Sequence, residues 1–243
     1  LDSIINVTDA IMVARGDLGV ELPPEEVPML QKNIIKKCAK AGKPVIVASQ
    51  MLESMVENSI PTRAEVTDIA NAIFDGADAV MLSEETASGK YPLETVEIMV
   101  RVAQKAEDED GINKNLEERD IKQSVAFAVS HSAYHICKEL EAKAIITFTS
   151  SGSTALKVSK WRPGSPIFAA VTKENLARRV SLYWGVRAII MDEFDNTDKM
   201  ISNMEKAVVS QKLLKKDDMV VITAGVPVGV TGTTNLIKVH KIS

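Results

Sequence analysis

Short apolar runs alternate with amphipathic stretches along most of the chain. In the first half, three of these runs are almost continuously apolar, as expected of strands that are buried on both faces of a parallel sheet. They predict strands at Ala10–Ala14, Pro44–Ala48 and Ala77–Leu82. The amphipathic stretches predict helices at Pro24–Ala41, Thr62–Phe74 and Pro92–Ala106. This alternation favours an α/β fold with a parallel sheet.

The same alternation returns in the second half of the chain, after a predicted helix near Ile121–Leu140. Five further strands are predicted, at Ala144–Thr149, Ile167–Val171, Val186–Met191, Met219–Ala224 and Leu236–Lys241. The last two strands are joined by Gly225–Asn235, which leaves no room for a crossover helix, so we expect them to pair antiparallel. The second half therefore predicts a mixed, mostly parallel sheet.

A highly charged stretch, Glu107–Arg119, separates the two halves. It is poor in apolar residues, which indicates a solvated linker between two packed units. We therefore predict a first unit over residues 1–107, a linker over 108–120 and a separate α/β domain over 121–243. Because the chain begins at Leu1, only a few residues before a predicted buried strand, we expect it to be a piece of a longer protein.

Polar residues follow each of the three strands predicted in the first half. These are Arg15-Gly16-Asp17, Ser49-Gln50 and Ser83-Glu84-Glu85. In a (β/α)₈ barrel, the groups that carry the chemistry lie at the carboxyl ends of the parallel strands. Three strands cannot close a barrel, so the pattern predicts a partial TIM barrel made of three β/α units.

The run from Ala14 to Glu21 is the strongest candidate for chemistry. Asp17 lies beside two glycines, so it combines a carboxylate that could hold Mg²⁺ with backbone amides that a ligand can approach. The alternative is that Asp17 caps a short helical turn and that Gly16 serves only the bend. Ser49 and Ser83 have the same two interpretations: each either contacts a ligand or caps a helix.

Composition indicates which kinds of partner and which cellular compartment to expect. The formal net charge is −4 and the chain has no dense run of Lys or Arg, which argues against nucleic acid as a partner. No apolar stretch reaches the roughly 20 residues that span a bilayer, so we expect no membrane partner. Cys38 and Cys137 suit reduced core thiols, which makes the cytoplasm the expected setting.

A second candidate site follows the first strand of the second half. Ser150, Ser151, Gly152, Ser153 and Thr154 offer hydroxyl and amide groups where a helix is expected to begin. Such a loop can hold a phosphate group, and it can equally be an ordinary turn with a serine cap. The residues alone leave these two interpretations open.

Of the three histidines, His131 and His135 alone have a spacing that suits a shared metal ion. We expect them to lie on an apolar helix face and to serve packing or capping. Trp161 and Trp184 are expected to anchor a core or an interface.

Four longer motifs resemble pyruvate kinase in their order and spacing. They are IMVARGDLGVELP, KPVIVASQMLESM, PTRAEVTDIANAIFDGADAVMLSEETASGKYPLE and ITAGVPVGVTGTTN. The resemblance covers nearly the whole chain and implies the last strands of the catalytic barrel followed by the C-terminal regulatory domain. It implies phosphoryl transfer from phosphoenolpyruvate to ADP, giving pyruvate and ATP in glycolysis. Mg²⁺ or Mn²⁺, K⁺ and a homotetramer are implied for the whole enzyme.

The resemblance also implies roles for individual residues. Asp17 corresponds to a Mg²⁺ ligand, and the amides of Gly16 and Asp17 correspond to groups that hold the substrate carboxylate. Arg15 is expected to fix the end of the barrel by pairing with carboxylates. Ser49 stands where the family normally has Thr, a residue that contacts phosphoenolpyruvate and takes part in protonation of the enolate.

Ser83 and Glu85 match positions beside the nucleotide, whereas Glu84 replaces a usual Gly and Ser88 replaces what is often a Lys. The family's Lys-Ile-Glu segment, its K⁺ ligands and its lid domain have no counterpart in this sequence. We therefore expect the 243-residue chain alone to be inactive. The alternative is a non-catalytic module for effector binding and oligomerisation.

In the second half, residues 149–154 match the family's allosteric phosphate loop, from Thr149 to Thr154. Gly225–Thr234 matches the loop that folds over the effector, and it contains no Arg or Trp. Ser153 stands where some members have Arg. These differences favour a monophosphate effector, such as AMP or a sugar monophosphate, over a bisphosphate.

Overall fold

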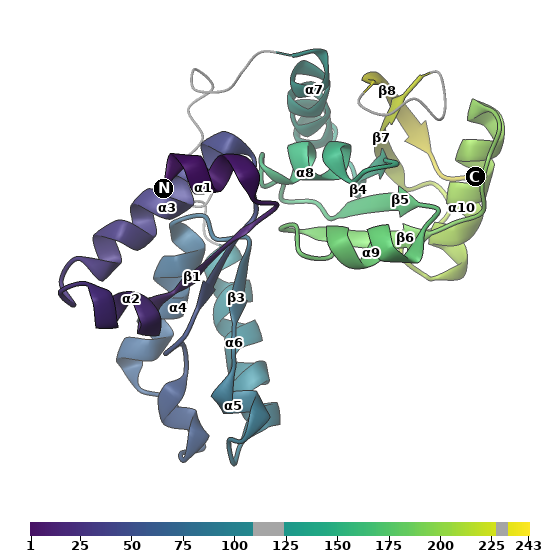
Figure 1. Cartoon of the computed structure of the whole chain (residues 1–243). Coiled ribbons are helices and arrows are strands. Elements are labelled where there is room, and N and C mark those ends of the chain that lie inside the picture. The colour runs from purple at the N-terminus through teal and green to yellow at the C-terminus, as the bar shows by residue number, and fades with distance from the viewer. Residues whose placement is uncertain (109–123, 227–232) are drawn as a thin grey trace. The chain divides into compact units, whose positions relative to one another are not determined.

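The computed structural model describes residues 1–108, 124–226 and 233–243. The chain divides into two compact units, Leu1–Asp120 and Ile121–Ser243, and each is described by itself (Figure 1). Of the linker predicted over 108–120, all but Asp108 lies outside the described residues. Asp108 ends the last described helix of the first unit.

The first unit contains a parallel sheet of three strands in the order β1-β2-β3. Its elements, in chain order, are α1 Asp2–Val7, β1 Ile11–Ala14, α2 Arg15–Glu21, α3 Val27–Ala41, β2 Val45–Ala48, the 3₁₀ helix η1 Glu53–Val56, α4 Arg63–Phe74, β3 Ala79–Met81, α5 Glu84–Ala87 and α6 Pro92–Glu107. The three predicted β/α units are confirmed, and the bounds of their strands and main helices differ from the prediction by at most three residues.

Local sequence signals explain where the main helices begin and end. The side chain of Thr62 accepts a hydrogen bond from the backbone N–H of Glu65, and the Glu65 carboxylate accepts one from the backbone N–H of Thr62. This capping box starts α4 one residue later than predicted. Helix α3 ends at Gly42, which adopts a left-handed conformation with φ 70° that glycine takes at little cost.

One face of the first sheet packs against helices. Val13, Val47 and Val80 lie side by side in register, and they contact a core that includes Ile35 of α3 and Ile69 of α4. The prediction that these strands are buried on both faces is wrong within the described chain. On the opposite face, the side chain of Met12 is 52% exposed.

The second unit contains a five-stranded sheet in the order β6-β5-β4-β7-β8. Its elements are α7 Val125–Glu139, β4 Ala144–Phe148, α8 Ser153–Ser159, β5 Ile167–Val171, α9 Glu174–Val180, β6 Val186–Ile190, α10 Thr197–Ser210, β7 Met219–Gly225 and β8 Thr234–Lys241. All neighbouring strands are parallel except β7 and β8, so the predicted mixed sheet with an antiparallel edge is confirmed.

Helices cover both faces of this second sheet (Figure 1). Ile146 of β4 packs with Met204 of α10 on one face. The next residue towards the N-terminus, Ile145, packs with Cys137 of α7 on the other face. Because successive side chains of a strand point to opposite faces, a central strand between two helical layers is apolar throughout. All five residues of β4 are accordingly buried.

Candidate functional site

The candidate residues of the first unit lie at the carboxyl ends of its three strands. Helix α2 begins at Arg15, directly after β1, so Gly16 and Asp17 occupy its first turn. Ser49 follows the last residue of β2, and Ser83 lies two residues beyond β3. Since these strands are parallel, their carboxyl ends meet at one edge of the sheet.

Ser49 lies close to Gly16. A Cβ atom added to Gly16 would meet the Ser49 side chain at 3.7 Å from Cβ and 3.8 Å from Oγ. Ser49 and Gln50 both adopt positive φ angles, of 68° and 55°. This conformation is uncommon for residues other than glycine and costs about 1–2 kcal/mol for each residue.

Arg15 holds this strained turn in place. Its Nε–H donates to the carbonyl oxygen of Ser49 over 3.2 Å, and one terminal nitrogen donates to the carbonyl oxygens of Ser49 and Gln50 over 2.6 and 3.2 Å. The other terminal nitrogen forms an ion pair with Asp68 of α4. Hydrogen bonds from a charged donor contribute about 1.5–3 kcal/mol each, enough to offset the strain. The predicted pairing of Arg15 with a carboxylate is confirmed.

Glu85 joins the loops that follow β2 and β3. Its side chain is buried, at 3% exposure, and its two carboxylate oxygens accept the backbone N–H groups of Leu52 at 3.2 Å and Ser83 at 2.8 Å. These bonds satisfy a carboxylate that would be costly to bury alone. The structure therefore shows Glu85 fixing loop geometry, and its predicted position beside a nucleotide stays a prediction.

Asp17 is the residue of this edge that could hold a metal ion. It is exposed in the first turn of α2. Within the described ranges, no three His, Cys, Asp or Glu side chains gather closely enough to form a metal site. A single accessible carboxylate nevertheless fits Mg²⁺, which usually keeps several water ligands and takes one or two carboxylates together with substrate oxygens.

The second candidate loop lies at the start of α8 in the other unit. The backbone N–H of Gly152 donates to Thr149 Oγ1 over 2.9 Å, which closes the turn. Gly152 has a φ of 85°, and a Cβ added there would lie 3.1 Å from a methyl group of Val180 and 3.2 Å from the hydroxyl of Tyr183. The positive φ and these close contacts both favour glycine at this position. Ser153 and Thr154, with their hydroxyl groups, follow it in the first turn of α8.

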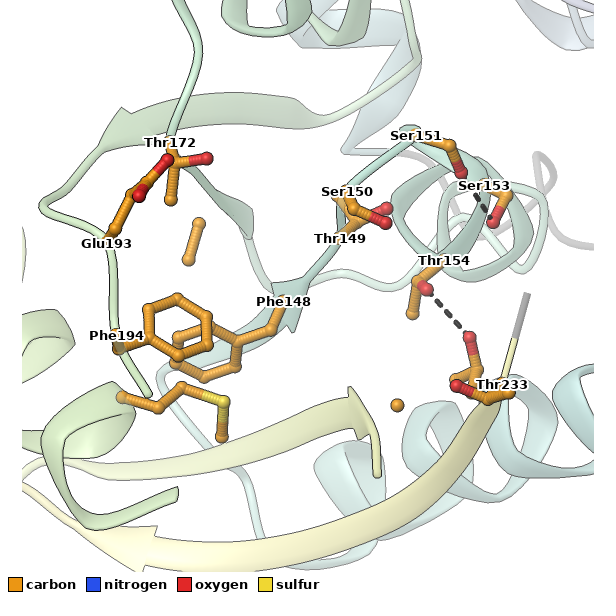
Figure 2. A pocket seen from close by; sticks show the side chains of 14 residues that line it. Phe148, Thr149, Ser150, Ser151, Ser153, Thr154, Thr172, Glu193, Phe194 and Thr233 are labelled. Atoms are coloured by element: carbon orange, nitrogen blue, oxygen red, sulfur yellow. Dashed lines mark hydrogen bonds between the residues drawn. The ribbon is translucent and has the colours of Figure 1, made fainter. Parts of the chain in front are cut away.

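These hydroxyl groups line a cavity of about 240 Å³. Figure 2 shows the serines and threonines of the loop on one side and the rings of Phe148 and Phe194 below them. The two rings pack edge to face, with centroids 5.8 Å apart. Thr154 also shares a hydrogen bond of 2.7 Å with Thr234 of β8. The cavity therefore combines a hydroxyl-rich wall with an aromatic floor.

Thr172, Glu193 and Phe194 are among the cavity residues that the sequence analysis did not identify. Thr172 directly follows β5, whereas Glu193 and Phe194 follow β6 by a few residues. In the view of Figure 2, Glu193 and Thr172 lie on the other side of the cavity from the serines of the loop. Polar groups gather at the carboxyl ends of parallel strands, and this rule indicates Thr172 after β5 and Glu193 after β6.

Two family models match the chain. The model for the pyruvate kinase barrel domain covers residues 1–96, and the model for the pyruvate kinase alpha/beta domain covers residues 127–240. The chain belongs to the pyruvate kinase family. It is 50% identical to a pyruvate kinase of Clostridium acetobutylicum, over all of this chain and 52% of that protein. It is 49% identical to one of Geobacillus stearothermophilus, over all of this chain and 42% of that protein.

A solved pyruvate kinase structure has the same fold. The crystal structure of a pyruvate kinase from Cryptosporidium parvum matches with a TM-score of 0.88 and 39% identity, over 100% of this chain and 48% of that chain. The chain thus spans about half the length of the relatives it matches. The predicted fold class, a partial TIM barrel followed by an α/β domain with a mixed sheet, is confirmed.

The structure divides the predicted site residues into two groups. Gly16, Asp17 and Ser49 lie at the strand ends of the first unit, together with Ser83 and Glu85. The loop from Thr149 to Thr154 belongs to the second unit. Among the described residues, no helix has both the length and the apolar character needed to cross a membrane.

Proposed function

We propose that a whole pyruvate kinase containing this chain transfers the phosphoryl group of phosphoenolpyruvate to ADP, giving pyruvate and ATP. The proposal is supported by the two family models and by relatives named as pyruvate kinases. The observation that carries it for this chain is the close approach of Ser49 to Gly16 in the first turn of α2. A hydroxyl group there faces a helix start, which favours a bound anion.

Each residue of this edge has a proposed task. The amides of Gly16 and Asp17, which have no partner in the first turn of a helix, donate to the substrate carboxylate. The Asp17 carboxylate would hold Mg²⁺ or Mn²⁺, and the bound ion would neutralise charge on the substrate oxygens. Ser49 Oγ contacts phosphoenolpyruvate and takes part in protonation of the enolate.

Ser83 and Glu85 are proposed to lie beside the nucleotide. The Glu85 carboxylate accepts the N–H of Ser83, which supports a role in positioning the loop that approaches ADP. K⁺ would bind through residues outside this sequence. The 243 residues alone therefore hold part of the catalytic site, and we expect them to show no turnover. The cytoplasm is the proposed setting, because Cys38 and Cys137 are buried, free thiols.

An assay of pyruvate formation from phosphoenolpyruvate and ADP tests this proposal. In the whole enzyme, Asp17→Asn should lower kcat/KM by roughly a hundredfold or more, because it removes a charge that stabilises the transition state. Glu21→Gln removes an exposed carboxylate from the other end of α2 and should leave kcat/KM unchanged. A fully active Asp17→Asn variant, or turnover by the 243-residue chain alone, would contradict the proposal.

The loop from Thr149 to Thr154 is proposed to bind the phosphate of an allosteric effector. The hydroxyl-rich wall of the cavity supports this function. None of the described residues that line the cavity is Lys or Arg, and Glu193 adds a carboxylate. Because the described lining has a carboxylate and no cationic side chain, it favours the less charged monophosphate, such as AMP or a sugar monophosphate, over a bisphosphate.

Calorimetric titration with AMP, a sugar monophosphate and a sugar bisphosphate tests the effector proposal. Ser153→Arg, which adds a cation at the cavity wall, should raise affinity for the bisphosphate by roughly tenfold or more. Ser202→Arg adds the same charge on an exposed position of α10 and should not. Tighter binding of the bisphosphate than of either monophosphate by the unchanged chain would refute the predicted preference.

A second function, a non-catalytic module for effector binding and oligomerisation, is favoured by one observation. All described residues that line the cavity belong to the second unit. If effector binding and self-association are found in the 243-residue chain without turnover, the module describes what the chain does alone. The homotetramer proposed for the whole enzyme would be checked by sedimentation of the whole protein and of this chain.

A further inference from the structure

Two histidines on α7 form a cluster outside the sites described above. His131 and His135 are one helical turn apart, a spacing that brings two side chains together on one face. Their Nε2 atoms face each other at 2.8 Å. The expectation that the pair serves packing holds for His131, which is half-buried against Trp161, but not for His135, which is exposed. Both rings are therefore within reach of solvent.

Aromatic neighbours fix the ring of His131. It stacks on Phe127 at a centroid distance of 6.2 Å and an interplanar angle of 13°, and it packs against Trp161 at 4.3 Å. Trp161 is itself buried, and its indole N–H donates to Ser130 Oγ over 3.4 Å. His131 thus rests on a surface that is fixed by the core of the second unit.

The ring of His135 is also held in its orientation. It meets His131 edge on, with centroids 4.3 Å apart and an interplanar angle of 86°, and it contacts the ring of Tyr134 at 5.0 Å. Because both rings are already oriented, a ligand that binds between them has little side-chain freedom to restrict. Such preorganisation favours binding.

The separation of the two Nε2 atoms suits a particular coordination geometry. Two nitrogens with metal bonds of about 2.0–2.1 Å are about 2.8–3.0 Å apart when the bonds meet at a right angle, and about 3.3–3.4 Å apart in a tetrahedron. The observed 2.8 Å is a hydrogen bond between the two rings, and a cation with right-angle coordination can replace it with almost no change in the separation of the nitrogens. Right-angle geometry with imidazole ligands is typical of Cu²⁺ and Ni²⁺, whereas Zn²⁺ prefers a tetrahedron.

We propose that His131 and His135 form a binding site for a divalent transition-metal cation with right-angle coordination, Cu²⁺ or Ni²⁺. The cation replaces the proton that the two Nε2 atoms otherwise share. Within the described ranges, no third His, Cys, Asp or Glu joins the pair, so the proposed site has two protein ligands in the part of the chain that the structure describes. A bound cation links two successive turns of α7.

Calorimetric titration of the untagged 243-residue chain with NiCl₂, slightly above neutral pH, tests the site. We expect one Ni²⁺ per chain, bound roughly a hundredfold more weakly by His135→Gln, because a chelate gains at least that factor over a single ligand. The matched control is the double variant Ser132→His/His135→Gln. It keeps the number of histidines but places two of them at adjacent positions, which do not share a helix face. This variant should bind as weakly as His135→Gln.

If either variant binds Ni²⁺ as tightly as the unchanged chain does, the proposed site is wrong. His131→Gln gives an independent test of the second ligand, and circular dichroism establishes that each variant retains its helical content. Zn²⁺ should bind more weakly than Ni²⁺ to the unchanged chain. Equal or tighter binding of Zn²⁺ would overturn the right-angle geometry.

Discussion

Replacing Gly16 with alanine should raise the free energy of unfolding but lower the kcat/KM of the proposed reaction. Gly16 lies in the first turn of α2, and its φ is not among the positive values found for other glycines. The added Cβ would meet Ser49 Cβ at 3.7 Å and Oγ at 3.8 Å, which is ordinary van der Waals contact. Alanine therefore fits, and it should raise the free energy of unfolding by up to about 1 kcal/mol because glycine loses more backbone entropy in a helix.

The same methyl group should weaken the proposed binding of phosphoenolpyruvate. It would lie beside the amide of Gly16 and the side chain of Ser49, both of which we propose to contact the substrate. Losing one hydrogen bond to a charged group costs about 1.5–3 kcal/mol. This corresponds to a roughly ten- to hundredfold lower kcat/KM in the whole enzyme.

Gly19→Ala is the matched control for this prediction. Gly19 belongs to the same helix, and a Cβ added there has no neighbour within 4 Å. It should show a similar gain in stability and unchanged kinetics. Urea unfolding of the 243-residue chain measures the first quantity, and pyruvate formation by the whole enzyme measures the second. Wild-type kcat/KM in Gly16→Ala, or an equal kinetic loss in both variants, would refute the reasoning.

Three further predictions concern buried or hydrogen-bonded groups of the first unit. Glu85→Ala should lower the free energy of unfolding in urea by about 1–3 kcal/mol, because it leaves the buried backbone N–H of Leu52 unpaired and removes the bond to Ser83. Burial raises the pKa of Glu65, but hydrogen bonds from Ser54 and Thr62 outweigh it and leave the pKa below the usual 4.5. The stability that Glu65 contributes is therefore present above pH 4.5 and is lost as the pH falls through its folded-state pKa, which unfolding at a series of pH values should show. Burial raises the pKa of Cys38 from 9.0 to about 11, so this thiol should react with a thiol reagent only on unfolding, and its contribution to stability should fall as the pH rises from 9.0 towards 11.

Each of these predictions has an internal control. Glu84→Ala removes an exposed carboxylate next to Glu85 and should change stability little, so equal effects of the two substitutions would contradict the role of Glu85. Glu65→Gln should remove the acid-dependent loss, and an unchanged pH profile in that variant would rule Glu65 out as its source. Labelling of Cys38 in the folded chain at the rate seen in urea would contradict its burial.

The strands could be predicted from the sequence because a strand that is buried on both faces is a continuous run of apolar residues. In β4, Ile145 and Ile146 are both buried, since helices cover both faces of the second sheet. The same interpretation was wrong for Met12, because the helices described in the first unit pack on one face of its sheet. An apolar run predicts a strand, but it does not reveal whether helices of this chain cover both faces of that strand.

Short-range signals predicted element ends and one strand direction. The spacing of Thr62 and Glu65 sets the start of α4 through bonds within four residues. The short connection after β7 required an antiparallel partner. The order of the strands could not be predicted, because the place of β7 beside β4 depends on contacts between segments more than 70 residues apart.

The position of Ser49 beside Gly16 could not be derived from either local sequence. It depends on left-handed φ angles at Ser49 and Gln50, and on a guanidinium group that reaches them from 34 residues away. The two carboxylates at the strand ends, Asp17 and Glu85, are equally plausible ligands in the sequence. The structure distinguishes them. Glu85 is buried and its carboxylate accepts two backbone N–H groups, whereas Asp17 is exposed. A strand-end position thus identifies residues that either hold a loop or meet a ligand, and hydrogen bonding and burial distinguish the two.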